Sequence, residues 1–236
     1  MDTVVYIILV PMVYVAVGVF ICGTAVRLFK MYREPKHPTT LQIFPETRPR
    51  WLWAVRDTFL FPTVLKENPL HWIFLMIFHV CFFLLIIGHM ELIESFSVFQ
   101  IIEHDVFLGG GYVGLLLSIA LLFFLLKRFV SPYRELSVAE DYYLLILLFL
   151  TVVFGSEMDW ARTWYGYEEL SAEAYQEYLQ SLLYLRPELP GAMTDSGHSF
   201  MMALHVFFAN LFLMIFPFSK FMHSFFSYAM NKLRRG

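Results

Sequence analysis

Four long uncharged stretches dominate this sequence. They cover residues 3–26, 70–90, 106–126 and 196–219, and none of them contains Asp, Glu, Lys or Arg. Each is long enough for an α-helix to cross the hydrocarbon core of a bilayer, which takes about 20 apolar residues. Because a soluble domain cannot keep such stretches in contact with water, the sequence predicts an integral membrane protein.

A fifth, shorter stretch completes the predicted fold. Residues 142–156 are uncharged, and the flanking segments extend them to spanning length if Glu140, Asp141 and Glu157 lie near the membrane interfaces. The sequence therefore predicts an all-α integral membrane protein, a single domain over residues 1–236 built as a five-transmembrane-helix bundle. The expected helices cover about residues 4–28, 70–92, 108–129, 138–160 and 197–222.

The composition excludes several soluble classes of protein. Hydrophobic residues make up 58% of the chain and charged residues 16%, which excludes intrinsic disorder. Two cysteines cannot staple a secreted domain, and a net charge of −3 gives no basic surface for nucleic acid. The first apolar stretch lacks a basic flank and is too long for a cleaved signal, so it is expected to remain as a spanning helix.

Lysine and arginine are concentrated in alternate connections between the predicted helices. Residues 27–66 carry eight of the 17 basic residues, and residues 127–134 and 220–235 carry seven more, whereas residues 91–105 carry none. Positively charged short loops remain in the cytoplasm. The pattern therefore predicts an extracytoplasmic N-terminus and a cytoplasmic C-terminus.

Two connections contain predicted amphipathic helices. Residues 50–56 alternate cationic and aromatic side chains between Pro49 and Pro62, which is typical of a short interfacial helix. That helix serves either as an anchor at the membrane surface or as a docking face for a cytoplasmic partner. The outer connection, residues 157–197, contains a second amphipathic stretch at 172–185. It is a cap, a contact for an extracytoplasmic subunit, or part of a solvated loop.

Four histidines lie within or beside the predicted second and fifth helices. His79 and His89 are ten residues apart, about 15 Å along a helix, and His205 and His223 are eighteen apart, about 27 Å along an unbroken helix and on one face. Ionisable groups inside a bilayer are costly, so they are candidates for function. Because the two helices are predicted to run in opposite directions, His89 can face His205 near the outside and His79 can face His223 near the cytoplasm.

Two facing imidazoles in each leaflet are the arrangement that binds a haem iron from both axial directions. The sequence therefore predicts two haem b groups, with His89 and His205 on the outer iron and His79 and His223 on the inner iron, roughly 20 Å apart. Each ligating ring needs an acceptor for its second nitrogen, usually a backbone carbonyl. Alternatively, the histidines only join helices or carry protons in a transporter or a non-redox membrane anchor.

Three glycines are candidates for contact with a cofactor. Gly88 adjoins His89, and Gly111 and Gly114 lie at the start of the predicted third helix. A glycine exposes backbone without a side chain, so a porphyrin plane can approach closely. Ordinary packing of helices through small residues gives the same pattern.

Several of these features occur together in one known family. They are the spacing that ends in Leu85-Ile86-Ile87-Gly88-His89, Gly109-Gly110-Gly111 before the third helix, Lys127-Arg128 after it, and Phe216-Pro217-Phe218-Ser219-Lys220-Phe221-Met222-His223 with His205 eighteen residues earlier. In this combination the chain resembles the gamma subunit of respiratory nitrate reductase, a dihaem cytochrome b. It resembles equally the membrane cytochromes of sulfite-reduction-associated complexes and those joined to heterodisulfide-reductase-like iron–sulfur proteins.

The resemblance implies a function. It implies a membrane-anchoring subunit of a quinone-linked oxidoreductase complex, in a prokaryotic cytoplasmic (inner) membrane, that passes electrons between menaquinone or ubiquinone and a cytoplasmic iron–sulfur subunit. Other membrane or extracytoplasmic redox subunits are expected, and nucleic acid is not. Relatives hold the quinone with a Lys where this chain has His104, so the resemblance makes His104 the quinone residue. A haem wire without a quinone site, linking outer and inner subunits, is the remaining alternative.

Overall fold

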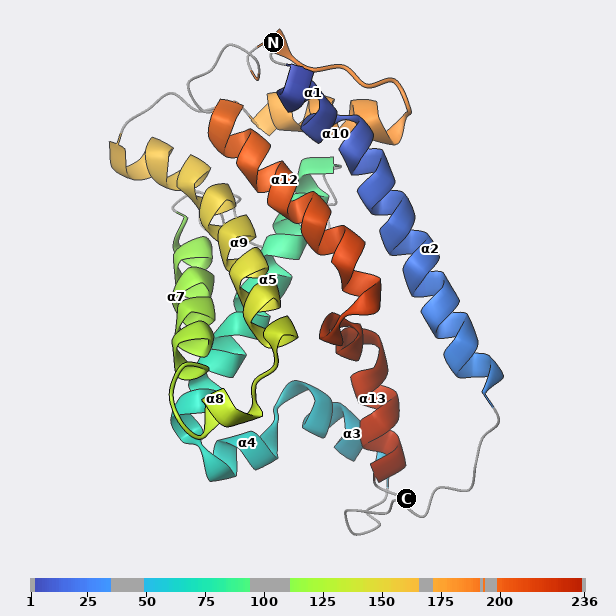
Figure 1. Cartoon of the computed structure of the whole chain (residues 1–236), viewed down its shortest axis with the longest axis vertical. Coiled ribbons are helices and arrows are strands. Elements are labelled where there is room, and N and C mark those ends of the chain that lie inside the picture. Colours follow the sequence, from blue (N-terminus) through green and yellow to red (C-terminus); the bar gives the residue numbers. More distant parts are fainter. Residues whose placement is uncertain are drawn as a thin grey trace. The chain divides into compact units, whose positions relative to one another are not determined.

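The computed structural model describes residues 3–34, 49–93, 111–165, 172–191, 193 and 199–234. These residues form helices joined by short turns, and no strand occurs among them (Figure 1). The helices are α1 (Thr3–Leu9), α2 (Pro11–Arg33), α3 (Arg50–Phe59), α4 (Pro62–Glu67), α5 (Pro69–Ile93), α7 (Tyr112–Lys127), α8 (Tyr133–Leu136), α9 (Ala139–Tyr165), α10 (Ala172–Leu183), α12 (Ser199–Ile215), the 3-10 helices η1 (Phe216–Phe218) and η2 (Lys220–Met222), and α13 (His223–Arg234).

Four helical segments are long and apolar enough to cross a membrane. They are Thr3–Arg33, Pro69–Ile93, Ala139–Ala161 and Ser199–Phe218. Helix α7 is also apolar, but its 16 residues are fewer than the others have. Large apolar side chains such as Ile21, Phe83 and Ile119 are exposed on these helices, as surfaces that face lipid require. The all-helical membrane fold is thus confirmed, and the fifth span and the orientation stay predictions.

The first predicted helix is interrupted at Pro11. Its ring nitrogen carries no hydrogen, so α1 ends at Leu9 and α2 begins at the proline. Side chains from other helices bond to the backbone beside this break. The Asn210 amide donates to the carbonyl of Ile8 at 3.1 Å, and the Tyr178 hydroxyl donates to that of Leu9 at 2.6 Å. The break is therefore a junction for three helices.

The last predicted helix, residues 197–222, is not continuous, which is a correction to the sequence analysis. Helix α12 ends at Ile215, because Pro217 cannot donate a backbone hydrogen bond. Ser219 is extended, with φ −112 and ψ 176, and its hydroxyl caps the next turn by accepting from Phe221 N at 3.2 Å. His205 and His223 therefore lie on different helices, and the estimate of 27 Å along one unbroken helix does not apply.

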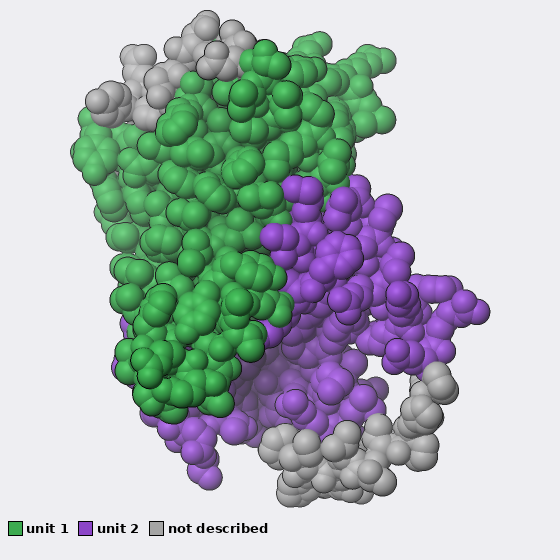
Figure 2. Space-filling view, viewed as in Figure 1, with its two compact units in different colours: residues 1–16, 77–212 green, residues 17–76, 213–236 purple. Residues whose placement is uncertain are grey.

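The chain divides into two compact units, which Figure 2 colours separately. Unit 1 comprises Met1–Ala16 and Ile77–Phe212, and unit 2 comprises Val17–Met76 and Leu213–Gly236. Each unit is built from segments that are distant in the sequence.

Helix α10 is the predicted amphipathic helix of the long fourth connection, and in unit 1 it packs on α1, α2 and α12. Leu9, Tyr178, Met193 and Met202 belong to one buried apolar cluster. The Tyr14 hydroxyl donates to the carbonyl of Leu182 at 3.0 Å. Burial raises the pKa of Tyr178 above its usual value, and the nearby phenol of Tyr14 adds to the rise. Because it is packed and hydrogen-bonded, α10 is not a solvated segment, and its roles as a cap or as a contact for a subunit stay predictions.

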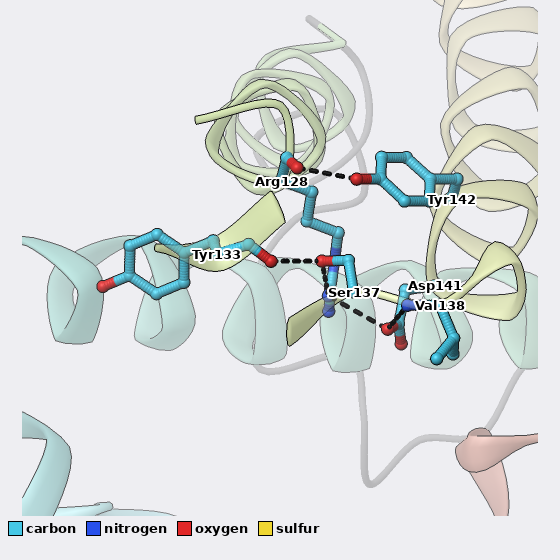
Figure 3. A network of polar contacts seen from close by, with 6 residues as sticks. All are labelled: Arg128, Tyr133, Ser137, Val138, Asp141 and Tyr142. Atoms are coloured by element: carbon cyan, nitrogen blue, oxygen red, sulfur yellow. Dashed lines mark hydrogen bonds and ion pairs between the residues drawn. The ribbon is translucent and has the colours of Figure 1, made fainter. Parts of the chain in front are cut away.

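Helices α7 and α9 pack side by side in unit 1, and a polar network closes the turn between them (Figure 3). The Arg128 guanidinium lies 3.2 Å from a carboxylate oxygen of Asp141 and donates to the hydroxyl of Ser137 at 3.0 Å. The same Asp141 oxygen accepts from the backbone of Val138 at 3.1 Å, and the Tyr142 hydroxyl donates to the Arg128 carbonyl at 2.7 Å. The network holds the start of α9 against the end of α7.

Unit 2 contains the predicted interfacial helix, now α3, packed on α13. Ala54 is fully buried, and the Asn231 amide donates to the Thr58 hydroxyl at 3.0 Å. The guanidinium of Arg56 lies 4.8 Å from the Trp53 ring centre. The helix is confirmed, and its two predicted roles, surface anchor or docking face, both stay open.

Candidate functional site

The imidazoles of His89 and His205 face each other in unit 1. His89 projects from α5 and His205 from α12, and their ring centres lie 6.0 Å apart with the ring planes inclined by 28°. The structure thus brings together the two histidines that the sequence assigned to an outer site.

The same nitrogen is hydrogen-bonded in both rings. His89 Nδ1 lies 2.6 Å from the carbonyl oxygen of Leu85, and His205 Nδ1 lies 2.8 Å from that of Thr151. A carbonyl oxygen only accepts, so Nδ1 carries the hydrogen in each ring. Nε2 then keeps its lone pair, and it is the atom that can bind a metal.

Helix α9 makes room for His205. A Cβ atom built on Gly155 would lie 2.7 Å from both Cε1 and Nδ1 of the His205 ring. Only glycine leaves space for the imidazole at that position. Sequence reasoning did not find Gly155 or Thr151, because α9 contains no histidine, and a glycine within an apolar stretch was the single available signal.

The outer pair fits a haem iron. Two imidazole nitrogens each about 2 Å from one metal place the ring centres about 6 Å apart when the rings point at each other. The separation of 6.0 Å agrees with this value. Among the described residues no group of three or more His, Cys, Asp or Glu side chains could hold a metal ion. A haem iron needs only two protein ligands, since the porphyrin supplies the others.

The predicted inner pair is divided between the two compact units. His79 is half-buried on α5 in unit 1, and His223 is the exposed first residue of α13 in unit 2. The His223 ring resembles the outer pair in one respect, because its Nδ1 lies 2.9 Å from the carbonyl oxygen of Lys220. The pairing of His79 with His223 stays a prediction.

The three candidate glycines lie at helix contacts or inside the bundle. Gly88 is buried on α5. Gly111 has φ 64, a conformation that favours glycine, and its carbonyl accepts from Trp160 Nε1 at 3.0 Å. A Cβ on Gly114 would overlap the side chain of Ser156. Packing of α7 on α9 thus accounts for Gly111 and Gly114, while their contact with a cofactor stays a prediction. His104 lies outside the described residues.

Comparisons with known proteins identify the family of this chain. The family model described as nitrate reductase gamma subunit matches residues 63–236. Over 94% of its length the chain is also 26% identical to the Hdr-like menaquinol oxidoreductase cytochrome b-like subunit of Archaeoglobus fulgidus, and the match covers 76% of that protein. The family match includes the segments that carry all four histidines.

Proposed function

Because this chain belongs to the nitrate reductase gamma subunit family, we propose that it is the membrane-anchoring cytochrome b subunit of a respiratory redox complex. It binds two haem b groups and passes electrons between a membrane quinone and a cytoplasmic iron–sulfur subunit. The observation that carries the proposal is the facing of His89 and His205 at 6.0 Å with both Nδ1 atoms already hydrogen-bonded.

In the proposed outer centre, His89 and His205 would hold one haem iron through their Nε2 atoms. A haem held by two histidines would supply one-electron transfer and would have no open position for substrate. Leu85 and Thr151 keep each imidazole in one tautomer through their carbonyl oxygens. The protein's part in the reaction would therefore be to hold the two histidines still and to leave no exchangeable position on the iron.

The proposed inner centre uses His79 and His223. Support comes from the sequence, where the ten-residue spacing on α5 brings His79 about 15 Å nearer the other end of that helix than His89. The concentration of Lys and Arg in alternate connections supports an extracytoplasmic N-terminus and a cytoplasmic C-terminus. Together they give a path for electrons across a prokaryotic cytoplasmic membrane.

The quinone is proposed to bind near the outer centre, with His104 as its hydrogen-bonding residue. An imidazole can bond to a quinone oxygen and carry a proton at neutral pH. The relative from Archaeoglobus fulgidus is named a subunit of a menaquinol oxidoreductase, which favours menaquinol over ubiquinol as the donor. Oxidation of menaquinol near the outer face would then send electrons towards the cytoplasm.

The partners are proposed to be a cytoplasmic iron–sulfur subunit and further membrane or extracytoplasmic redox subunits. The name of the relative, a subunit of an Hdr-like oxidoreductase, supports an assembly of several chains. Helix α3 offers Arg50 and Arg56 as exposed cations for an acidic partner.

Spectroscopy of the purified native complex tests the proposal. We expect a Soret band and reduced b-type bands, two haems for each copy of this chain, and reduction by a menaquinol analogue. His89→Ala and His205→Ala should each remove one haem and leave the other. A preparation without haem would overturn the proposal, and haem that no quinol reduces would point to the wire without a quinone site.

A further inference from the structure

The two histidines of the outer site are held in different ways. The acceptor for His89 Nδ1 is Leu85, four residues earlier on the same helix. The acceptor for His205 Nδ1 is Thr151, which lies on α9 and not on α12. Helix α9 thus touches a proposed ligand without supplying one.

Three contacts join α9 and α12 at this level. Besides the hydrogen bond from His205 to Thr151, Gly155 leaves the space that the His205 ring fills. Beside them, Phe154 and Phe208 stack with ring centres 5.5 Å apart and planes inclined by 9°. The nearest atoms to a group added at position 155 all belong to the His205 imidazole, so the imidazole is the group that must move.

We propose that Thr151 and Gly155 are positioning residues for the outer haem. The carbonyl of Thr151 and the missing side chain of Gly155 set the rotation and the hydrogen bond of the His205 imidazole, and through it the reduction potential of the outer centre. This inference rests on the proposed function, since it needs His205 to be an iron ligand.

The physical basis is the electronic effect of the hydrogen bond. When Nδ1–H donates to a carbonyl oxygen, the ring becomes a stronger base and a better donor at Nε2. Stronger donation stabilises the oxidised iron, so loss of the bond raises the potential. Leu85 keeps its hydrogen bond to His89 when a residue of α9 is substituted. Such a substitution therefore alters only His205 of the two proposed ligands.

Substitution at Gly155 tests the proposal. In Gly155→Ala the new methyl group must displace the His205 ring from Thr151, whereas Gly18→Ala on α2 adds a methyl group with no atom within 4 Å. We expect Gly155→Ala to keep both haems but to change the outer reduction equilibrium at least tenfold, an upward shift of about 59 mV in a one-electron titration. Gly18→Ala should leave both potentials as they are. An unchanged outer potential in haem-loaded Gly155→Ala would overturn the inference.

A ligand-replacement experiment needs no bulky side chain. The full complex carrying His205→Gly should lose the outer haem as His205→Ala does, so haem is added back together with the probe. Added imidazole can then bind the iron and donate to Thr151, while 1-methylimidazole binds through its other nitrogen and has no hydrogen to donate. We expect both to restore the low-spin spectrum, and only imidazole to restore the original potential. Equal potentials with the two probes would overturn the inference while leaving the haem assignment intact. Absence of haem from the unmodified complex would instead defeat the proposed function.

Discussion

The side-chain amide of Asn210 donates to the backbone carbonyl of Ile8 at 3.1 Å, and so joins α12 to α1 across 202 positions of the sequence. Asn210 is only 2% exposed, in the middle of an apolar helix. A buried amide without a hydrogen-bond partner lowers the stability of the fold. The bond to Ile8 therefore determines where α1 lies as well as stabilising it.

We expect Asn210→Ala to lower the free energy of unfolding by about 0.6–2 kcal/mol, the range for hydrogen bonds between membrane helices. Equilibrium unfolding in mixed micelles measures it. Asn231→Ala, on the partly exposed α13, removes the bond to Thr58 of α3. It should lower the free energy of unfolding less, because water can replace that bond. A larger loss in Asn231→Ala would contradict this ranking.

Tyr178 predicts a dependence of stability on alkaline pH. Its pKa is raised in the folded chain by burial first and then by Tyr14, so the folded chain keeps the proton longer than the unfolded chain does. The contribution of Tyr178 to stability is therefore complete below the ordinary tyrosine pKa of about 10 and falls as the pH rises above it. Melting temperatures of the parent and of Tyr178→Phe, followed from pH 8 to 11, should show a steeper decline for the parent. Parallel curves would exclude the effect.

The network at the start of α9 predicts a contrast between two carboxylates. Asp141 is buried and bonds to both Arg128 and the Val138 backbone, whereas Glu135 pairs with Arg134 at an exposed position. Asp141→Ala should lower the unfolding free energy by about 1–3 kcal/mol and speed hydrogen exchange in the turn between α7 and α9. Glu135→Ala should cost less than about 1 kcal/mol. Equal effects would mean that the network is not a unit.

Substitutions at Gly114 and Ser156 should have coupled effects on stability. A methyl group on Gly114 would overlap Ser156, so Gly114→Ala should destabilise the chain by about 1–3 kcal/mol. Adding Ser156→Ala removes the nearest atom and should recover part of the loss, which a double-mutant cycle measures. If the two changes are additive and Gly114→Ala instead lowers haem content, the glycine serves the cofactor and not the contact of α7 with α9.

The inner site makes its own prediction. His79→Ala and His223→Ala should each remove one haem, and it should be the haem that survives in His89→Ala and His205→Ala. Haem analysis with a potentiometric titration of each variant distinguishes the two centres. If His79→Ala and His223→Ala abolished different centres, the predicted pairing would be wrong.

The helices were predictable because spanning stretches are uncharged over their whole length, as residues 70–90 are in α5. The interruption after Ile215 was less predictable. Pro217 signals a bend, but a proline in a membrane helix can be accommodated within one helix when neighbouring groups satisfy the freed carbonyls. Here Ser219 caps a new turn, and α13 begins as a separate helix at His223.

The candidate site likewise has a part that the sequence could predict and a part that it could not. The facing of His89 and His205 follows from residue types and from the opposite directions expected of two helices, which a sequence contains. The contribution of α9 does not, because the acceptor on Thr151 is a backbone carbonyl that every residue possesses. Gly155 likewise gains its role from the ring beside it, and nothing in its own neighbours along the chain distinguishes it from a packing glycine.

The packing of α10 on the N-terminal helices has a consequence for biosynthesis. Tyr178 reaches Leu9 across 169 positions, and Tyr14 reaches Leu182 across 168. When the first span leaves the ribosome, neither bond can form, since the partner segment has not yet been translated. The N-terminal helix therefore lacks both bonds until most of the polypeptide has been synthesised, and a truncation before α10 should leave that helix more accessible to proteases.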